Sequence, residues 1–404
     1  MATTAEYLNK LVVQKNALAD NLTTKGVTAT HDETLETLVP KVLEISGGST
    51  DSAIYPIGAD SRPTGDVVIS DGITSLYKYV FYDNKNVTSV SLPHSLTMLN
   101  SNAFGDCINL ANVTTKGQEL SFGYGVFENN KSLTNESCNA LCQNIGEQDV
   151  GNSSVGMFGG CTSLTDVVVD WCSHYMFENC LNLKKLKITN TKNKIGTGSN
   201  ICYNCTALTD VVLPENTDLA TINTNAFYNC SSLININIPE GITIIDDLAF
   251  YNCGFSSISL PSTLKTIYGG SGSSKGTFRD CKKLSTLSLP ESVTKVDGYS
   301  FNGCTSLTEI YFPANITSYA TTALYGCTAL KTVTVGNGWI NALNLSYSDN
   351  ITVDCIKTII DNVATVSIST KITLSATVYQ NFTLDNEYAD YLALATSKGW
   401  SIGT

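Results

Sequence analysis

The fold is decided by the stretch Phe301-Asn-Gly-Cys304-Thr-Ser-Leu307-Thr-Glu-Ile310-Tyr-Phe-Pro313, because its pattern recurs along the chain. The shared form is Phe-x-x-Cys-x-x-Leu-x-x-Val/Ile-x-Leu/Ile-Pro, and two further clean copies begin at Phe227 and Phe278. Shorter or degenerate copies begin at Phe81, Phe104, Phe127, Phe158, Phe177, Cys202, Phe250 and Leu324. In the copies at Phe81 and Phe127, Asn84 and Asn130 replace the cysteine.

The spacing of the repeats indicates a solenoid. The late repeat cysteines are 25, 23, 28, 23 and 23 residues apart, counting from Cys205 to Cys327. This period lies in the range of roughly 20–29 residues that is typical of leucine-rich repeats. A single repeat cannot bury its own apolar faces, so neighbouring repeats must stack on one another. We therefore expect a leucine-rich-repeat solenoid, β-rich, with short strands and helical turns.

The pattern within each repeat predicts which side chains point inward. Alternation along a strand places Ile310 and Phe312 in the core, and Glu309 and Tyr311 outside it. The proline that follows ends the strand, because it cannot donate a ladder hydrogen bond. A second short strand and a turn that buries the next aromatic side chain complete the repeat.

Nine of the fourteen cysteines occupy the same repeat position. Stacked repeats would bring these small, soft side chains into one buried structural ladder. Disulfides are disfavoured because equivalent positions all point the same way. A metal or redox role is the competing hypothesis, but Cys202-Tyr-Asn-Cys205 is a lone C-x-x-C without a second pair or a histidine at ligand spacing. We expect no metal and no other cofactor. The ladder positions are Cys107, Cys161, Cys180, Cys205, Cys230, Cys253, Cys281, Cys304 and Cys327.

The repeated phrase resembles the BspA-like class of leucine-rich repeats, which has the cysteine after the aromatic residue and the same strand pattern. The resemblance covers roughly Asp66 to Val335, and the copies between Asn112 and Asn152 depart from it by inserted residues. Known members of this class are surface adhesins and virion proteins. The resemblance therefore implies recognition of cells, proteins or glycans, and the class brings no active site with it.

Composition excludes some partners. The net charge is −12 and only 15% of residues are charged, so no basic face is available to neutralise nucleic-acid phosphates. No stretch approaches the roughly 18 consecutive apolar residues of a membrane span. The first residues lack the basic and apolar regions of a signal peptide. We expect neither membrane insertion nor export by a signal peptide.

Residues 1–48 differ from the repeats and are predicted to form a helical hairpin. A first helix is expected over residues 6–22, and Thr30-His-Asp-Glu33 fits a capping box that opens a second. Tyr7-Leu-Asn-Lys-Leu, Lys25-Gly-Val and Leu38-Val-Pro-Lys-Val resemble N-terminal segments of phage tail-fibre, baseplate and other virion proteins. This resemblance implies an attachment and oligomerisation segment; a cap over the open end of the solenoid is the alternative. The apolar positions of these attachment helices are Leu11, Leu18, Leu22, Leu35 and Leu38.

The remaining boundaries follow from the same patterns. Residues 49–65 are predicted to be a linker, residues 66–345 the solenoid and residues 346–404 an α+β C-terminal cap. In the cap we expect helices over residues 350–361 and 385–397 and a strand over residues 371–377.

Two sets of side chains are candidates for ligand binding. Tyr203, Tyr228, Tyr251 and Tyr325 follow the aromatic position of their repeats and would present flat area with polar tips. Tyr311 and Asn237 occupy outward strand positions. The alternative is that the tyrosines only shield the core. Catalysis is disfavoured, since the pair Cys172-Ser-His174 lacks a third group to hold it.

These observations lead to a prediction of function. We expect a non-catalytic phage virion protein that presents a repeat surface for recognition of a host-cell glycan or protein, most consistent with tail-fibre or baseplate receptor binding. The alternatives are a capsid-decorating head fibre, and a bacterial adhesin or intracellular scaffold. We expect a homo-oligomer, assembled in the host cytoplasm, that contacts other virion proteins through its N-terminus.

Overall fold

The computed structural model describes residues 15–16, 19–20, 22, 29–32, 63–144, 156–170, 172–189, 198–215, 219–270 and 272–404. The chain divides into two compact units, Met1–Ser163 and Leu164–Thr404. Within each unit, short parallel strands from successive repeats pair side by side, which confirms the predicted leucine-rich-repeat solenoid. Most of the predicted hairpin and nearly all of the predicted linker lie outside the described residues.

The first unit contains two parallel three-stranded sheets, one from each strand of the repeat. Helix α3 (Asn135–Gln143) packs beside the last strand of the first sheet, β5, and lies in the stretch where the sequence departs from the repeat pattern by inserted residues. Ser137 Oγ on this helix accepts a hydrogen bond from the Val113 N–H at 2.9 Å, so the helix satisfies the edge of that strand. The sheets comprise β1 (Gly65–Val68), β3 (Val87–Ser91) and β5 (Asn112–Thr114), and β2 (Ser75–Leu76), β4 (Met98–Leu99) and β6 (Ser121–Phe122).

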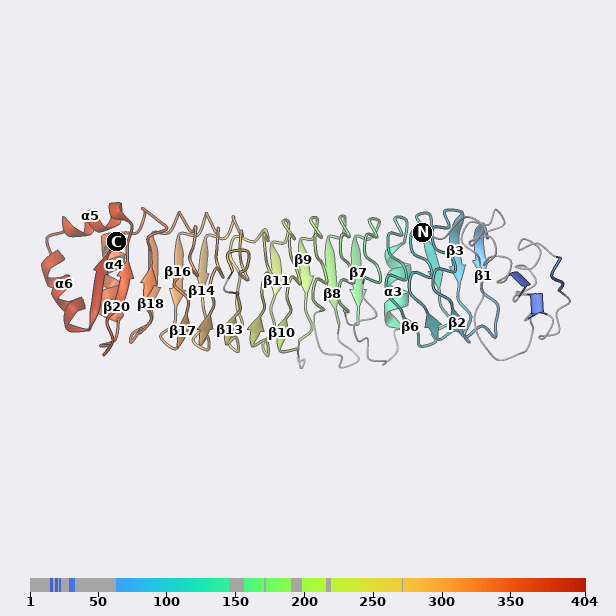
Figure 1. Cartoon of the computed structure of the whole chain (residues 1–404), viewed down its shortest axis with the longest axis horizontal. Helices are drawn as coiled ribbons and strands as arrows, with labels where there is room; N and C mark the ends of the chain where they lie inside the picture. Colours follow the sequence, from blue (N-terminus) through green and yellow to red (C-terminus); the bar gives the residue numbers. More distant parts are fainter. Residues whose placement is uncertain are drawn as a thin grey trace. The chain divides into compact units, whose positions relative to one another are not determined.

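The second unit repeats this plan over more turns (Figure 1). The outer strands form a four-stranded and a three-stranded sheet, whereas the second strands form one five-stranded sheet. The four-stranded sheet is β7 (Asp166–Val169), β8 (Lys185–Ile188), β9 (Asp210–Val212) and β11 (Asn235–Asn237). The three-stranded sheet is β14 (Thr286–Ser288), β16 (Glu309–Phe312) and β18 (Thr332–Val335). The five-stranded sheet is β10 (Thr221–Ile222), β12 (Ile244–Ile245), β13 (Thr266–Ile267), β15 (Lys295–Val296) and β17 (Ser318–Tyr319).

The C-terminal end of the second unit carries an α+β structure, as expected. Strands β19, β20 and β21 form one sheet, α6 packs on β21, and α4 packs on β18 and contacts α5 and α6 (Figure 1). Helix α5 and strand β21 were not predicted, and β19 begins three residues before the predicted boundary at 346. The elements are β19 (Leu343–Asn344), α4 (Val353–Asn362), β20 (Thr370–Thr373), α5 (Ala376–Thr383), α6 (Tyr388–Ser397) and β21 (Trp400–Gly403).

Many successive turns are joined by stacked rings and by a side-chain hydrogen bond. The rings of Phe278 and Phe301 stack with centroids 5.8 Å apart, and both are fully buried. Cys304 Sγ donates to the carbonyl oxygen of Phe278 at 3.1 Å. The same contact, at 3.0–3.2 Å, is made by Cys107, Cys161, Cys205, Cys230, Cys253, Cys281 and Cys327.

The outer strands of the second unit are interrupted in the repeat from Cys253 to Cys281, here called the shortened repeat because its cysteine-to-proline segment has lost one residue, although the whole repeat is 28 residues long. Cys230 is nine residues from Pro239, but Cys253 is only eight residues from Pro261. A Cβ atom on Gly254 would collide with the carbonyl oxygen of Ser231, so the shortened turn requires glycine. Residues 256–260 consequently form no strand, and β11 and β14 belong to different sheets.

The close approach at Gly254 predicts that Gly254→Ala destabilises the protein by about 1–3 kcal/mol, since the backbone must shift to admit the methyl group. Gly272→Ala is the matched control, because an added Cβ there meets no described atom closer than 3.8 Å. Urea unfolding followed by circular dichroism measures both variants. Equal stabilities would contradict the role assigned to Gly254.

Candidate functional site

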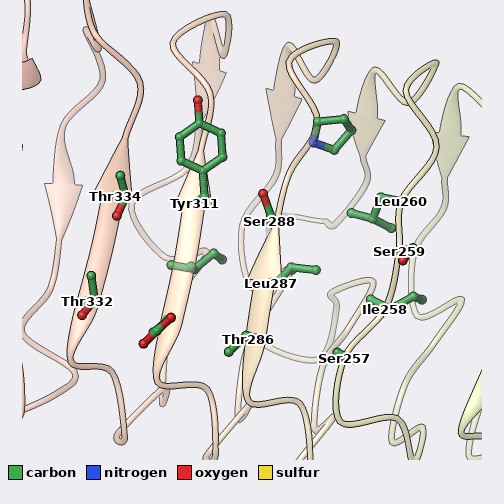
Figure 2. Close-up of a pocket in the computed structure, with 13 residues that line it drawn as sticks. Ser257, Ile258, Ser259, Leu260, Thr286, Leu287, Ser288, Tyr311, Thr332 and Thr334 are labelled. Atoms are coloured by element: carbon green, nitrogen blue, oxygen red, sulfur yellow. The ribbon is translucent and has the colours of Figure 1, made fainter.

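Two adjoining grooves lie on the outward strand face of the second unit. The first, of about 560 Å³, crosses β14, β16 and β18; the second, of about 430 Å³, crosses β9 and β11. Both include Ser257, Ile258 and Ser259, which lie in the shortened repeat. Figure 2 shows Thr334, Tyr311, Ser288 and Ser259 from successive turns of the first groove. The interruption of the strands therefore joins the two grooves.

The groove floor is apolar where the strands are interrupted. Ile236 and Ile258 occupy the inward repeat position but are half-buried. The equivalent Val211 and Leu287 on either side are only 1% and 4% exposed. The shortened repeat thus opens the core locally and presents aliphatic surface to a ligand.

The groove walls are polar and carry no positive charge. Among the residues that line the two grooves, the charged side chains are Asp210 and Glu309, and none is basic. The remaining polar side chains are hydroxyls and amides: Asn235, Asn237, Ser257, Ser259, Thr286, Ser288, Tyr311, Thr332 and Thr334. Such a surface suits a ligand that is neutral or positively charged and rich in hydrogen-bonding groups.

The backbone of the interrupted segment is also available. Residues 257–260 make no backbone hydrogen bond to any other residue that the structure describes, whereas Ser256 still accepts from the Ser285 N–H at 2.8 Å. Ser257 and Ser259 are exposed. Unpaired backbone groups at an exposed position bind water or a ligand.

Tyr311 has a fixed orientation and an unstacked ring. Its hydroxyl donates to Glu291 Oε1 at 2.6 Å, and this hydrogen bond, with partial burial, raises the pKa of Tyr311 to about 12. No ring–ring contact joins Tyr311 to another aromatic residue in the described part of the chain. The ring is held in place on β16, between the β14 and β18 residues that also line the first groove.

The four tyrosines that follow the aromatic position, predicted as one set of binding candidates, do not form one stack. Tyr203, Tyr228 and Tyr251 stack with centroids 4.4 and 4.2 Å apart, so the rings cover one another's faces. Tyr325 does not join this stack, and contacts Tyr299 and Tyr347 instead. These four tyrosines lie on the turns after each aromatic position, not on the strands. Tyr311 and Asn237, in contrast, line the first and the second groove.

Asparagine side chains run beside the tyrosine stack. Asn204 Nδ2 donates to Asn179 Oδ1 at 3.1 Å, Asn229 to Asn204 at 2.9 Å, and Asn252 to Asn229 at 2.7 Å. All four have positive φ, a backbone conformation that asparagine tolerates better than most residues. This ladder ties the turns together, so the tyrosine stack and its neighbours have a structural role whether or not they bind a ligand.

The cysteines are buried and free. Burial raises the pKa of Cys161, Cys281 and Cys327 to about 12. The thiolate is the reactive form of cysteine, so these thiols are poor nucleophiles and poor metal ligands. His174 Nδ1 accepts the Ser199 N–H at 3.0 Å and is occupied by that backbone group. Within the described ranges, no cluster of three or more His, Cys, Asp or Glu side chains is placed to hold a metal ion.

None of the helices in the described residues is both long enough and apolar enough to span a bilayer. The grooves were not predicted from the sequence as a site, although two of their residues were. The signal that could have located them is the eight-residue spacing from Cys253 to Pro261, where the other clean repeats have nine.

Comparisons with known proteins concern the repeats. The family described as "BspA type Leucine rich repeat region (6 copies)" matches residues 60–169, 150–231, 197–273 and 273–373 of this chain. No curated protein matches the chain.

Similar solved structures include a leucine rich cell surface protein from Faecalibacterium prausnitzii A2-165, at 20% identity over 68% of this chain and 88% of that chain, with a TM-score of 0.34. A leucine-rich repeat protein from Bacteroides ovatus shares 17% identity over 71% and 94% of the two chains, with a TM-score of 0.34. A leucine-rich repeat protein from Eubacterium ventriosum shares 19% identity over 70% of this chain and 76% of that chain, with a TM-score of 0.42. At these identities the similarity concerns the fold.

The raised pKa of Cys281 predicts a pH dependence of stability. The folded pKa of about 12 exceeds the ordinary 9.0, so the unfolded chain loses this proton first and the free energy of unfolding falls above pH 9. The thiol contributes up to about 1.4 kcal/mol per pH unit in that range. Cys281→Ala should therefore be less stable at pH 7.5 by about 1–3 kcal/mol and show a shallower decline above pH 9.

Urea unfolding at pH 7.5, 9.0 and 10.0 measures this effect. Thr305→Ala is the control, since Thr305 is exposed and its variant should follow the wild-type pH profile. Identical slopes for wild type and Cys281→Ala would show that the thiol is not buried in its neutral form.

Proposed function

We propose that this chain, which belongs to the BspA-type leucine-rich repeat family, is a non-catalytic recognition protein whose outward strand face in residues 164–404 binds a ligand on a cell surface. The observation that carries this proposal is the pair of adjoining grooves on that face. The grooves combine an apolar floor with walls of hydrogen-bonding side chains, and this combination is typical of ligand-binding sites.

A binding role agrees with the chemistry of the side chains. The thiols are buried, and His174 is engaged by a backbone N–H. The carboxylates of the grooves, Asp210 and Glu309, come from β9 and β16, which are separated by the intervening β11, the interrupted segment and β14. Paired acid and base catalysis needs two groups flanking one reacting bond, and this separation does not favour it.

Within this function we further propose that the chain is a phage virion protein attached through residues 1–48. The support is the resemblance of that segment to virion N-terminal segments. Its few described residues show contacts between the first predicted helix and the start of the second: His31 Nε2 lies 2.7 Å from Asp20 Oδ1, and Lys15 Nζ donates to the His31 carbonyl oxygen. Leu22 is buried, whereas the other four predicted attachment leucines lie outside the described residues.

If the outward strand face binds the ligand, Ser288→Arg should lower binding to cell envelopes at least tenfold, because the long charged side chain fills the first groove. Thr305→Arg, at an exposed position off the strands, should bind as the wild type does. Labelled full-length protein is incubated with a panel of bacterial and animal cell envelopes, and bound protein is measured by flow cytometry. Equal binding by both variants would place recognition elsewhere, and no binding by the wild type would refute a recognition role.

The virion proposal predicts that antibody against residues 54–404 labels phage particles from the source at the tail end in immunogold electron microscopy. Label over the head would indicate a capsid-decorating fibre instead. Particles without label would refute the virion placement and leave an adhesin or a scaffold.

If residues 1–48 are an attachment and oligomerisation segment, the full chain should form an oligomer and a chain without them should not. Light scattering should give a multiple of the subunit mass for the full chain and a single subunit for a 54–404 fragment. The same subunit number for both would make the N-terminal segment a cap and not an oligomerisation element.

A further inference from the structure

We infer that the two grooves form one continuous site for a linear, uncharged polysaccharide, with one pyranose ring stacked on Tyr311. This inference rests on the proposed recognition function and names the ligand class and the place where it binds. It depends on four observations: the floor and walls of the grooves, their charge, the state of Tyr311 and the free backbone of the interrupted segment.

The distribution of apolar and polar groups matches a sugar chain. A pyranose ring has faces lined with C–H groups and an edge of hydroxyls, so it buries well where an apolar floor meets a hydroxyl-rich wall. Ile236 and Ile258 supply that floor, because both are half-buried at positions where neighbouring repeats bury the side chain. Ser257, Ser259 and the flanking strand hydroxyls supply the wall.

The charge of the grooves selects against acidic polymers. Glu309 is exposed, Asp210 lines the other end, and no basic side chain lines either groove to neutralise a sulfate, phosphate or uronate. An ionised carboxylate accepts hydrogen bonds strongly, and neighbouring sugar hydroxyls can donate to its two oxygens. An uncharged sugar chain therefore fits both the carboxylates and the absence of cations in the lining.

Tyr311 is the tyrosine best prepared to receive a sugar ring. Tyr228 is stacked on both faces, by Tyr203 at 4.4 Å and by Tyr251 at 4.2 Å, and the two outer rings each have one face occupied. Tyr311 has no such partner among the described residues, and its hydroxyl is held by Glu291 at 2.6 Å. A ring that is already oriented loses little conformational entropy on binding.

The interrupted segment adds hydrogen-bonding groups that an ordinary repeat does not offer. The backbone N–H and C=O groups of residues 257–260 are unpaired with other described residues. Sugar hydroxyls both donate and accept, so they can satisfy either kind of group. Six successive turns, from β9 to β18, line the grooves. At a strand spacing of about 4.8 Å they extend over roughly 24 Å, which is long enough for several sugar units.

The test is an array of immobilised oligosaccharides probed with the full-length protein. The neutral probes are hexamers of β-1,4-linked glucose, xylose, mannose and N-acetylglucosamine. The charged probes are heparin, polygalacturonate and a lysine-rich peptide. We expect binding to at least one neutral hexamer, with an affinity that changes less than twofold between about 50 and 500 mM salt, because no net charge is neutralised.

Variants locate the site. Tyr311→Ala should weaken binding to the neutral hexamer about tenfold, the loss typical of one ring-stacking contact. Tyr311→Phe should retain most of the affinity, since it keeps the ring. Tyr77→Ala is the matched control: it removes an equally large, exposed side chain in the first unit, outside the grooves, and should leave affinity unchanged.

Three results would overturn the inference: binding only to the acidic polymers, binding only to the lysine-rich peptide, or no neutral hexamer bound. Equal affinities for wild type and Tyr311→Ala would overturn the assignment of the site. If the protein still binds cell envelopes and Ser288→Arg still prevents it, the recognition function survives and only the ligand class is wrong. If envelopes are not bound either, the recognition function fails with it.

Discussion

The structure depends on one contact that is repeated once per turn, the hydrogen bond from a buried side chain to a backbone carbonyl of the preceding repeat. Cysteine makes it in most turns; Asn130 Nδ2 makes the same bond to Phe104 at 3.0 Å, and Asn84 Nδ2 donates to Pro63. Asparagine also brings an acceptor that needs a partner: Asn84 Oδ1 accepts from the Asn86 N–H at 3.0 Å, whereas Asn130 Oδ1 is left buried without a partner in the described residues. Cysteine donates one bond and brings no strong acceptor that must be satisfied, which explains why it prevails at this position.

Because these contacts join only neighbouring turns, each repeat tolerates local changes that a globular core would not. The shortened repeat after Cys253 still makes its link, since Cys253 Sγ donates to Phe227 and Cys281 Sγ to Phe250. The second strands also remain paired past this point, from β12 to β13 to β15. The change is confined to the outward strand, where it separates the sheets and opens the grooves. Within this repeat, the cysteine hydrogen bond and the second strand keep the solenoid continuous, and the outward strand forms the grooves.

The predictions from the sequence succeeded where periodicity controls the structure. Ile310 and Phe312 point inward and Glu309 and Tyr311 outward, as expected, and the predicted second short strand of the repeat is present, for example at Lys295–Val296. The predictions were incomplete for helices that are not part of the repeat pattern. Thr134 caps the N-terminus of helix α3, since its side chain accepts from the Ser137 N–H, and this helix lies in a stretch that the sequence marked only as an irregular insertion. Helix α5 was missed, and its first two residues, Ala376 and Thr377, had been assigned to the strand expected over residues 371–377.

The sequence by itself determined the architecture, the buried cysteine positions and the acidic, hydroxyl-rich character of the surface, because a period of about 23 residues and a strand alternation of two leave little choice of inward side chains. Only the tertiary structure decided which tyrosines retain a free ring face. Tyr228 and Tyr311 are both outward in sequence, but stacking between adjacent turns covers the first and leaves the second uncovered. Likewise, the loss of one residue between Cys253 and Pro261 is visible in the sequence. Only the tertiary structure shows that this loss opens a groove, because a groove is formed by several neighbouring turns together and not by any one of them.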